Sequence, residues 1–115
     1  MRALLAAGPP PDAVVCFNDT LALGAMRALH DVGLRIPADV AVAGFDDIED
    51  GRFSMPTLTT VAPDKAYLAR VAVDLLAARL ATGGGQADGA PPREQTVPHR
   101  LIPRESTASA LRRRP

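Results

Sequence analysis

Apolar residues in the first half of the chain form two short unbroken runs separated by a helical pattern. Asp12 to Phe17 (DAVVCF) and Val40 to Gly44 (VAVAG) lack polar alternation, which is typical of parallel strands covered on both faces. Between these runs, apolar side chains recur at helical spacing over residues 19–32. A strand, a helix and a strand in this order predict a βαβ unit, whose crossover should be right-handed.

The ends of the first helix are marked by capping residues. Asn18-Asp19-Thr20 precedes the apolar pattern and supplies side-chain oxygens for an N-cap. We expect Asp19 to act only as a cap. Gly33 follows the last apolar position, where a glycine commonly ends a helix.

The second half of the chain predicts one more helix and two extended segments. Leu58 to Val61 is short and extended, and residues 64–81 carry an apolar helical face. The composition of residues 83–92, GGGQADGAPP, predicts a flexible linker. Gln95 to Ile102 contains a proline and precedes another, so a strand there should lie at a sheet edge.

The composition of the chain is close to the average for soluble globular domains, and its length allows one small domain at most. Its 115 residues are 47% hydrophobic and 23% charged with no net charge, and no apolar run is long enough to span a membrane. The N-terminal segment is a poor signal peptide. The single cysteine, Cys16, excludes an internal disulfide framework, so we expect a cytoplasmic protein. Residues 109–115 contain three consecutive arginines and predict a disordered basic tail.

Polar residues follow both predicted strands. Asn18 comes after the first strand and Asp46 after the second, and parallel strands in an α/β sheet bind ligands at their carboxyl ends. An amide and a carboxylate beside Phe17 and Phe45 suit a sugar, because the polar groups bond hydroxyls and an aromatic face covers the ring. The alternatives are helix capping by Asn18 and an ordinary polar turn at residues 46–47.

Other chemistries find no support in the sequence. The acidic residues of the 46–50 segment lack the spacing of a calcium loop. His30 and His99 have no metal-ligating partners at suitable spacing. Nucleophile elbows, phosphate-binding loops and dinucleotide motifs are absent from the sequence. We therefore expect no metal site, no cofactor and no enzymatic activity.

Five motifs in sequence order carry a family resemblance. They are NDTLALG (18–24), GLRIPADV (33–40), GFDD (44–47), PTLTT (56–60) and REST (104–107). Together they resemble the effector-binding domain of LacI/GalR-type bacterial transcriptional regulators, over about residues 3–108. The resemblance implies an α/β fold: part of a periplasmic-binding-protein-like lobe of the three-layer α/β/α type, with a parallel sheet.

The resemblance also implies roles for single residues. Asn18 and Asp46 align with effector-contacting positions and Phe45 with the pocket wall. A glutamine that often touches the effector is replaced by Pro63. The implied homodimer interface comprises a helical group and a loop residue: Leu23, Met26, Arg27 and Phe53.

The resemblance implies a module that binds a sugar-like effector and dimerises. Residues 1–108 match the C-terminal portion of such a domain, and the family's helix-turn-helix headpiece and first lobe have no counterpart in them. The protein would contact operator DNA only through that headpiece. We expect no contact with a membrane. Helix 64–81 would lack its usual packing partners, so we expect the isolated chain to be marginally folded or self-associating. The alternative is a fragment of a periplasmic-type sugar-binding protein for ABC uptake.

Overall fold

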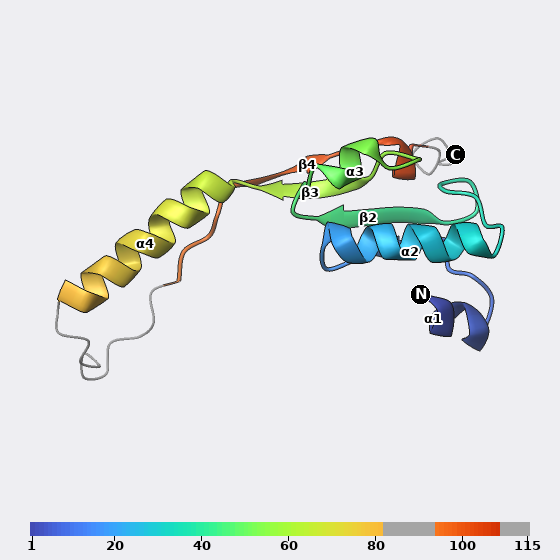
Figure 1. Ribbon diagram of the computed structural model, residues 1–115, viewed down its shortest axis with the longest axis horizontal. Helices are drawn as coiled ribbons and strands as arrows, with labels where there is room; N and C mark the ends of the chain where they lie inside the picture. The colour runs from blue at the N-terminus through green and yellow to red at the C-terminus, as the bar shows by residue number, and fades with distance from the viewer. Residues whose placement is uncertain (82–93, 109–115) are drawn as a thin grey trace, which may run out of the picture. The chain divides into compact units, whose positions relative to one another are not determined.

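The computed structural model describes residues 1–81 and 94–108, so the predicted linker and basic tail lie outside the described residues. The chain divides into two compact units, one containing residues 1–62 and 100–108 and the other containing residues 63–81 and 94–99. Figure 1 labels the elements in chain order. They are α1 (Arg2–Ala7), β1 (Ala13–Val15), α2 (Asp19–Asp31), β2 (Ala41–Phe45), α3 (Asp50–Phe53), β3 (Thr59–Pro63), α4 (Lys65–Ala81), β4 (His99–Ile102) and the 3-10 helix η1 (Glu105–Thr107).

The strands form one sheet in the order β1-β2-β3-β4. β1 pairs with β2 in parallel, with Val15 opposite Ala43, and β2 pairs with β3 in parallel, with Ala43 opposite Thr59. The predicted βαβ unit is therefore confirmed, because α2 connects two adjacent parallel strands. β4 lies at the edge of the sheet, as the prolines around it predict.

Both predicted ends of α2 are confirmed. The Asn18 side chain accepts a hydrogen bond from the backbone N–H of Leu21 at 2.8 Å, which caps the first turn. At the other end, Gly33 has a φ of 77° and its N–H donates to the His30 carbonyl at 2.9 Å. The N–H of Leu34 donates to the Leu29 carbonyl at 3.0 Å, which completes a Schellman motif.

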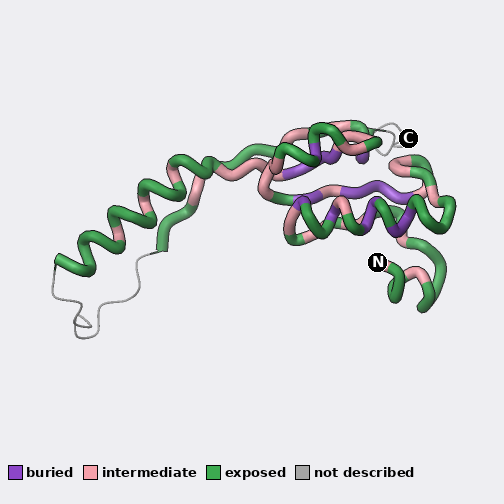
Figure 2. The backbone as a smooth tube through the Cα atoms, viewed as in Figure 1, coloured by how far each residue is buried: buried purple, intermediate pink, exposed green. Residues whose placement is uncertain are grey.

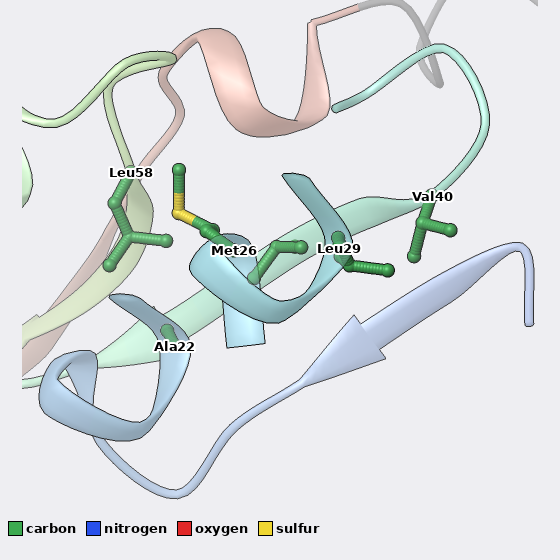
Figure 3. Packing of buried hydrophobic residues seen from close by; sticks show 6 residues of the cluster. Ala22, Met26, Leu29, Val40 and Leu58 are labelled. Carbon is green, nitrogen blue, oxygen red and sulfur yellow. The ribbon is translucent and has the colours of Figure 1, made fainter. Parts of the chain in front are cut away.

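The core lies between α2 and the sheet. α2 runs along β2, and buried positions are concentrated on these two elements (Figures 1 and 2). Figure 3 shows the side chains of Ala22, Met26 and Leu29 from α2 beside Val40 and Leu58. Their spacing of three or four residues places the α2 members on one helical face, which the surrounding strands cover.

The expectation that both strands of the βαβ unit are covered on both faces is wrong for β1. Val15 is 82% exposed, whereas Val14 is half-buried against the core. Successive side chains of a strand point to opposite faces of the sheet, so one face of β1 packs on the core and the face that carries Val15 lacks cover in the part of the chain that the structure describes. An apolar run therefore did not indicate burial here.

The acidic segment that follows β2 contains the short helix α3. Gly51 of α3 is buried, and its carbonyl accepts a hydrogen bond from the Leu58 N–H at 2.8 Å. This bond ties the segment to the start of β3. η1 was also not predicted; it forms where the C-terminal segment packs against the sheet.

The second unit is dominated by α4. The carboxylate of Asp64 accepts a hydrogen bond from the Tyr67 N–H at 2.9 Å and so begins the helix as predicted. No residue of α4 is buried. Its exposed apolar side chains include Leu68, Val73, Leu76 and Leu80. Among the helices of the described residues, none is long and apolar enough to cross a bilayer.

Candidate functional site

The C-terminal edge of the parallel sheet carries the predicted effector residues. Val15 and Ala43 are partners across β1 and β2, and Asn18 and Asp46 each follow this pair by three residues. Both residues therefore lie beyond the carboxyl ends of neighbouring parallel strands, where ligands bind in such sheets. No hydrogen bond joins Asn18 and Asp46 to each other in the described chain.

Asp46 has an unusual backbone and an unengaged side chain. Its φ is 110°, in the region that non-glycine residues seldom occupy, and it is half-buried. Its N–H donates to the Val61 carbonyl at 2.9 Å, which continues the β2–β3 pairing. Across residues 1–81 and 94–108, no group donates a hydrogen bond to its carboxylate. The carboxylate is thus available to a ligand.

Of the two polar atoms of the Asn18 side chain, one makes a hydrogen bond within the described part of the chain. Its Oδ1 accepts the capping hydrogen bond from Leu21, so the capping interpretation is confirmed for that atom. Its side-chain Nδ2 makes no hydrogen bond to the described part of the chain. Helix capping and ligand binding are therefore compatible, because they use different atoms of the same amide.

The two predicted aromatic residues are accessible at the same edge. Phe17 follows β1 and is 95% exposed, and Phe45 ends β2 and is 40% exposed. Exposed aromatic rings beside polar groups can cover the apolar face of a sugar ring.

Asp47 has a different role from its neighbour, because its carboxylate is held by two arginines. Its Oδ1 accepts from Nη2 of Arg104 at 2.6 Å and its Oδ2 from Nη2 of Arg52 at 2.9 Å. Its side chain is 11% exposed and that of Arg104 16% exposed, whereas that of Arg52 is 56% exposed. The hydrogen bonds from Arg104 and then Arg52 hold the pKa of Asp47 below its ordinary value, against the opposing effect of partial burial.

Asp19 is not merely a helix cap, and that expectation is wrong. It is the first residue of α2 and is completely buried. Its Oδ1 accepts from the hydroxyl of Thr60 at 2.6 Å, and its Oδ2 accepts from the Ile48 N–H at 2.9 Å. Asp19 therefore connects α2 to β3 and to the segment after Asp47. The sequence contains no signal for this, because an aspartate in the first turn of a helix is common without any tertiary contact.

The REST motif has a structural explanation. The Ser106 hydroxyl donates to the Val42 carbonyl at 2.7 Å and accepts from the Thr59 N–H at 2.8 Å. It bridges β2 and β3 at the point where their pairing begins. Nη1 of Arg104 donates to the Leu58 carbonyl at 2.8 Å. REST thus binds the LTT segment, 45 or more residues earlier in the chain.

The predicted dimer-interface residues occupy different environments. Met26 is 6% exposed and lies in the core, because it shares the sheet-facing side of α2 with Ala22 and Leu29. Leu23 is half-buried. Arg27 is exposed and its Nε donates to Asp31 at 2.7 Å. Phe53 of α3 is 76% exposed.

No cluster of three or more His, Cys, Asp or Glu side chains able to hold a metal ion occurs among the residues that the structure describes. Cys16 is half-buried, and burial raises the pKa of its thiol.

A domain family and several solved structures match this chain over nearly its whole length. The periplasmic binding protein-like domain family matches residues 1–107. A LacI-family transcriptional regulator of known structure from Sanguibacter keddieii is 48% identical with a TM-score of 0.77, covering 91% of this chain and 39% of that one. The lactose operon repressor of Rhizobium radiobacter is 44% identical over 79 residues, which are 69% of this chain and 70% of that protein. The chain belongs to the LacI family of transcriptional regulators.

Other members of the LacI family extend the comparison. The ribose operon repressor of Haemophilus influenzae is 42% identical over 80 residues, which are 70% of this chain; the chain spans 24% of that repressor. The lac repressor dimer bound to operator and the anti-inducer ONPF has a TM-score of 0.74 and 40% identity, over 91% of this chain and 30% of that one. A LacI-family regulator from Arthrobacter in complex with lactose has a TM-score of 0.71 and 40% identity, over 91% of this chain and 38% of that one. The LacI-family resemblance and the α/β fold predicted from the motifs are confirmed.

Lowering the pH is expected to weaken this fold through Asp47. Because its pKa is lower in the folded chain than in the unfolded one, the ionised carboxylate stabilises the fold above the unfolded pKa, about 4. This stabilisation is lost as the pH falls through the folded-state pKa. We expect the free energy of unfolding, measured in urea between about pH 7 and pH 3, to depend less on pH in Asp47→Asn than in the unaltered chain.

Asp31 provides the control for that measurement. Its carboxylate is bonded by Arg27 and Arg2 on the surface, and those bonds also lower its pKa. Asp31→Asn should reduce the pH dependence less than Asp47→Asn does, because solvent screens exposed ion pairs. Equal effects of the two substitutions would show that the Asp47–Arg104 contact has no special stabilising role.

Proposed function

We propose that this chain is part of the effector-binding domain of a LacI-family regulator and that Asn18 and Asp46 bind a sugar-like effector. The carboxylate of Asp46 carries the proposal, because it lies at the ligand-binding edge of the sheet without a hydrogen-bond donor from the described chain. Such a carboxylate can accept hydrogen bonds from two hydroxyl groups of a sugar. The lactose complex of the Arthrobacter regulator supports a saccharide as the class of effector.

The Asn18 amide complements this acceptor. Its Nδ2 can donate to a hydroxyl oxygen while Oδ1 caps α2, so ligand binding does not require the helix to lose its cap. The cap also fixes the orientation of the amide, which lowers the entropy lost on binding. Phe17 and Phe45 supply exposed apolar surface at the same edge for the ring of the sugar.

The proposal includes a homodimer. α2 carries the exposed Arg27 and the half-buried Leu23, which also packs against the core, and α3 presents Phe53 with most of its ring exposed. The lac repressor is a dimer when it is bound to its operator, and this supports dimerisation of the present chain. Operator binding is not assigned to α2 itself, because its apolar face packs on the sheet. The uptake-protein alternative is not favoured, since the similar proteins described above are transcriptional repressors and regulators.

Replacing Asp46 by glycine should weaken saccharide binding without weakening the fold. Glycine adopts a φ of 110° without steric cost, so the stability of Asp46→Gly should equal or exceed that of the unaltered chain. Loss of hydrogen bonds to a charged acceptor should reduce affinity by about tenfold or more. The measurement is a titration of the isotope-labelled chain with lactose and with cellobiose, followed by NMR at the Asn18 side-chain amide and the backbone amides of residues 45–47.

The control is Glu49→Gln, an exposed acidic residue of the same segment, which should leave the affinity unchanged. Two results would overturn the proposal. One is an unaltered chain whose signals at residues 18 and 45–47 do not respond to either saccharide. The other is an Asp46→Gly chain that binds as well as the unaltered one, which would make Asp46 a turn residue only.

A further inference from the structure

The turn that carries Asp46 consists of two consecutive residues in a rarely occupied backbone conformation. Asp46 has a φ of 110° and Asp47 a φ of 49°, directly after β2. Each such residue is unfavourable by about 1–3 kcal/mol for a side chain other than glycine, so the surrounding structure must hold the conformation. The contacts that hold it therefore determine where the carboxylate of Asp46 lies.

These contacts are concentrated on Asp47, and Arg104 provides the most buried of them. Its Nη2 bonds Oδ1 of Asp47, and its Nη1 bonds the carbonyl of Leu58 at 2.8 Å. The backbone N–H of Arg104 donates to Oγ1 of Thr59 at 2.8 Å. The guanidinium is thus fixed to the segment entering β3 at one end and to the turn at the other, in the forked geometry that arginine provides.

The residues on both sides of Asp47 are also fixed, but by backbone groups. The N–H of Asp46 donates to Val61 at 2.9 Å, and the N–H of Ile48 donates to Oδ2 of Asp19 at 2.9 Å. The N–H of Asp47 lies 3.3 Å from Oγ1 of Thr60. Of the two aspartates, Asp47 uses its side chain for anchoring, and Asp46 keeps its side chain for other contacts.

We propose that Arg104 is a positioning residue of the effector site: it holds Asp47 and thereby fixes the direction of the Asp46 carboxylate. This inference rests on the proposed role of Asp46. It assigns the REST segment, 57 residues from Asp47 in the sequence, a function in effector affinity. Arg52 bonds the same carboxylate from a largely exposed position, so its contribution is the smaller of the two.

The test compares Arg104→Gln, Arg104→Lys and Arg52→Gln in the 115-residue chain, with Arg35→Gln as control. Arg35 is an exposed arginine that bonds Asp39 away from the turn. The three-bond coupling between the amide and α protons of Asp46 reports its φ without any ligand. The affinity for lactose and for cellobiose, measured by the same NMR titration, reports the consequence for binding.

We expect Arg104→Gln to change the Asp46 coupling and to lower the affinity for the saccharide that binds by about tenfold to a hundredfold, the range found when the support of a ligand-contacting group is removed from metal sites. Arg104→Lys should give a coupling and an affinity between those of Arg104→Gln and those of the unaltered chain. An ammonium group keeps the charge but cannot bond both Leu58 and Asp47 in a forked geometry. Arg52→Gln should have less effect than Arg104→Gln, and Arg35→Gln should leave both readouts unchanged.

The two readouts separate the two proposals. If the Asp46 coupling is the same in Arg104→Gln, Arg104→Lys and the unaltered chain, the positioning role is wrong whether or not a saccharide binds. If the coupling changes but the unaltered chain binds neither saccharide, the proposed effector site fails while the contact that fixes Asp46 stands. Should Arg104→Gln not fold, Arg104→Lys and Asp47→Asn decide by the same coupling, since each removes part of the same contact.

Discussion

Replacement of Asp19 by alanine is expected to destabilise the chain by about 2–6 kcal/mol, because two donors lose their acceptor and each such loss costs roughly 1–3 kcal/mol. The donors are the hydroxyl of Thr60 and the N–H of Ile48. No solvent reaches the Asp19 side chain, so water cannot replace it without rearrangement of the core. For a domain whose net stability is about 5–15 kcal/mol, a loss of this size leaves a substantial unfolded population.

The measurement is urea unfolding followed by far-UV circular dichroism. Asp19→Asn should be intermediate, because the amide oxygen can still accept from one of the two donors. Thr20→Ala is the matched control: Thr20 is the next residue of α2 and is exposed. If Asp19→Ala and Thr20→Ala lower the free energy of unfolding equally, Asp19 serves the helix end and not the connection to β3.

Two glycine-to-alanine substitutions are expected to change stability in opposite directions. A Cβ on Gly44 of β2 would collide with Oδ1 of Asp19 and lie 3.1 Å from its Cα and 3.2 Å from Cβ of Ala22. These atoms belong to α2, so the helix would have to move away from the strand. Overpacking of this kind costs about 1–3 kcal/mol. Gly44→Ala should therefore lower the urea midpoint.

Gly24 is the matched control within α2. It is exposed, and a Cβ there would meet nothing within 4 Å. Alanine in a helix interior is more stable than glycine by about 0.5–1 kcal/mol, so Gly24→Ala should raise the urea midpoint. A Gly44→Ala chain as stable as the unaltered one would show that α2 does not approach β2 as closely as the packing around Asp19 indicates.

The local features of the fold were predictable because they depend on nearby residues. Asn18 and Gly33 mark the two ends of α2, as predicted. An N-cap and a left-handed glycine after the C-terminus both act within one turn of the helix. The βαβ unit followed from the spacing of two apolar runs around this helix. The motif order was also sufficient to identify the LacI family.

Which faces of each helix and strand are buried was less predictable, because burial depends on which neighbouring elements are present. The apolar run of β1 predicted cover on both faces, yet Val15 lies on a face of the strand that is exposed. Met26 was assigned to an interface by family resemblance, but α2 directs it into the core. A sequence pattern gives the period of an element and leaves open what lies against each side.

The candidate site shows the same division between sequence and structure. The sequence by itself determined that aspartates follow the second strand, at the edge where an α/β sheet binds ligands. It could not distinguish Asp46 from Asp47, which are identical in type and adjacent. Only the tertiary structure decided that Arg104 binds Asp47 and that the carboxylate of Asp46 receives no hydrogen bond from the described residues, because the Arg104–Asp47 contact joins residues 57 apart in the chain. The same reason explains Asp19, whose partners Ile48 and Thr60 lie 29 and 41 residues away and are brought to it by the packing of α2 on the sheet.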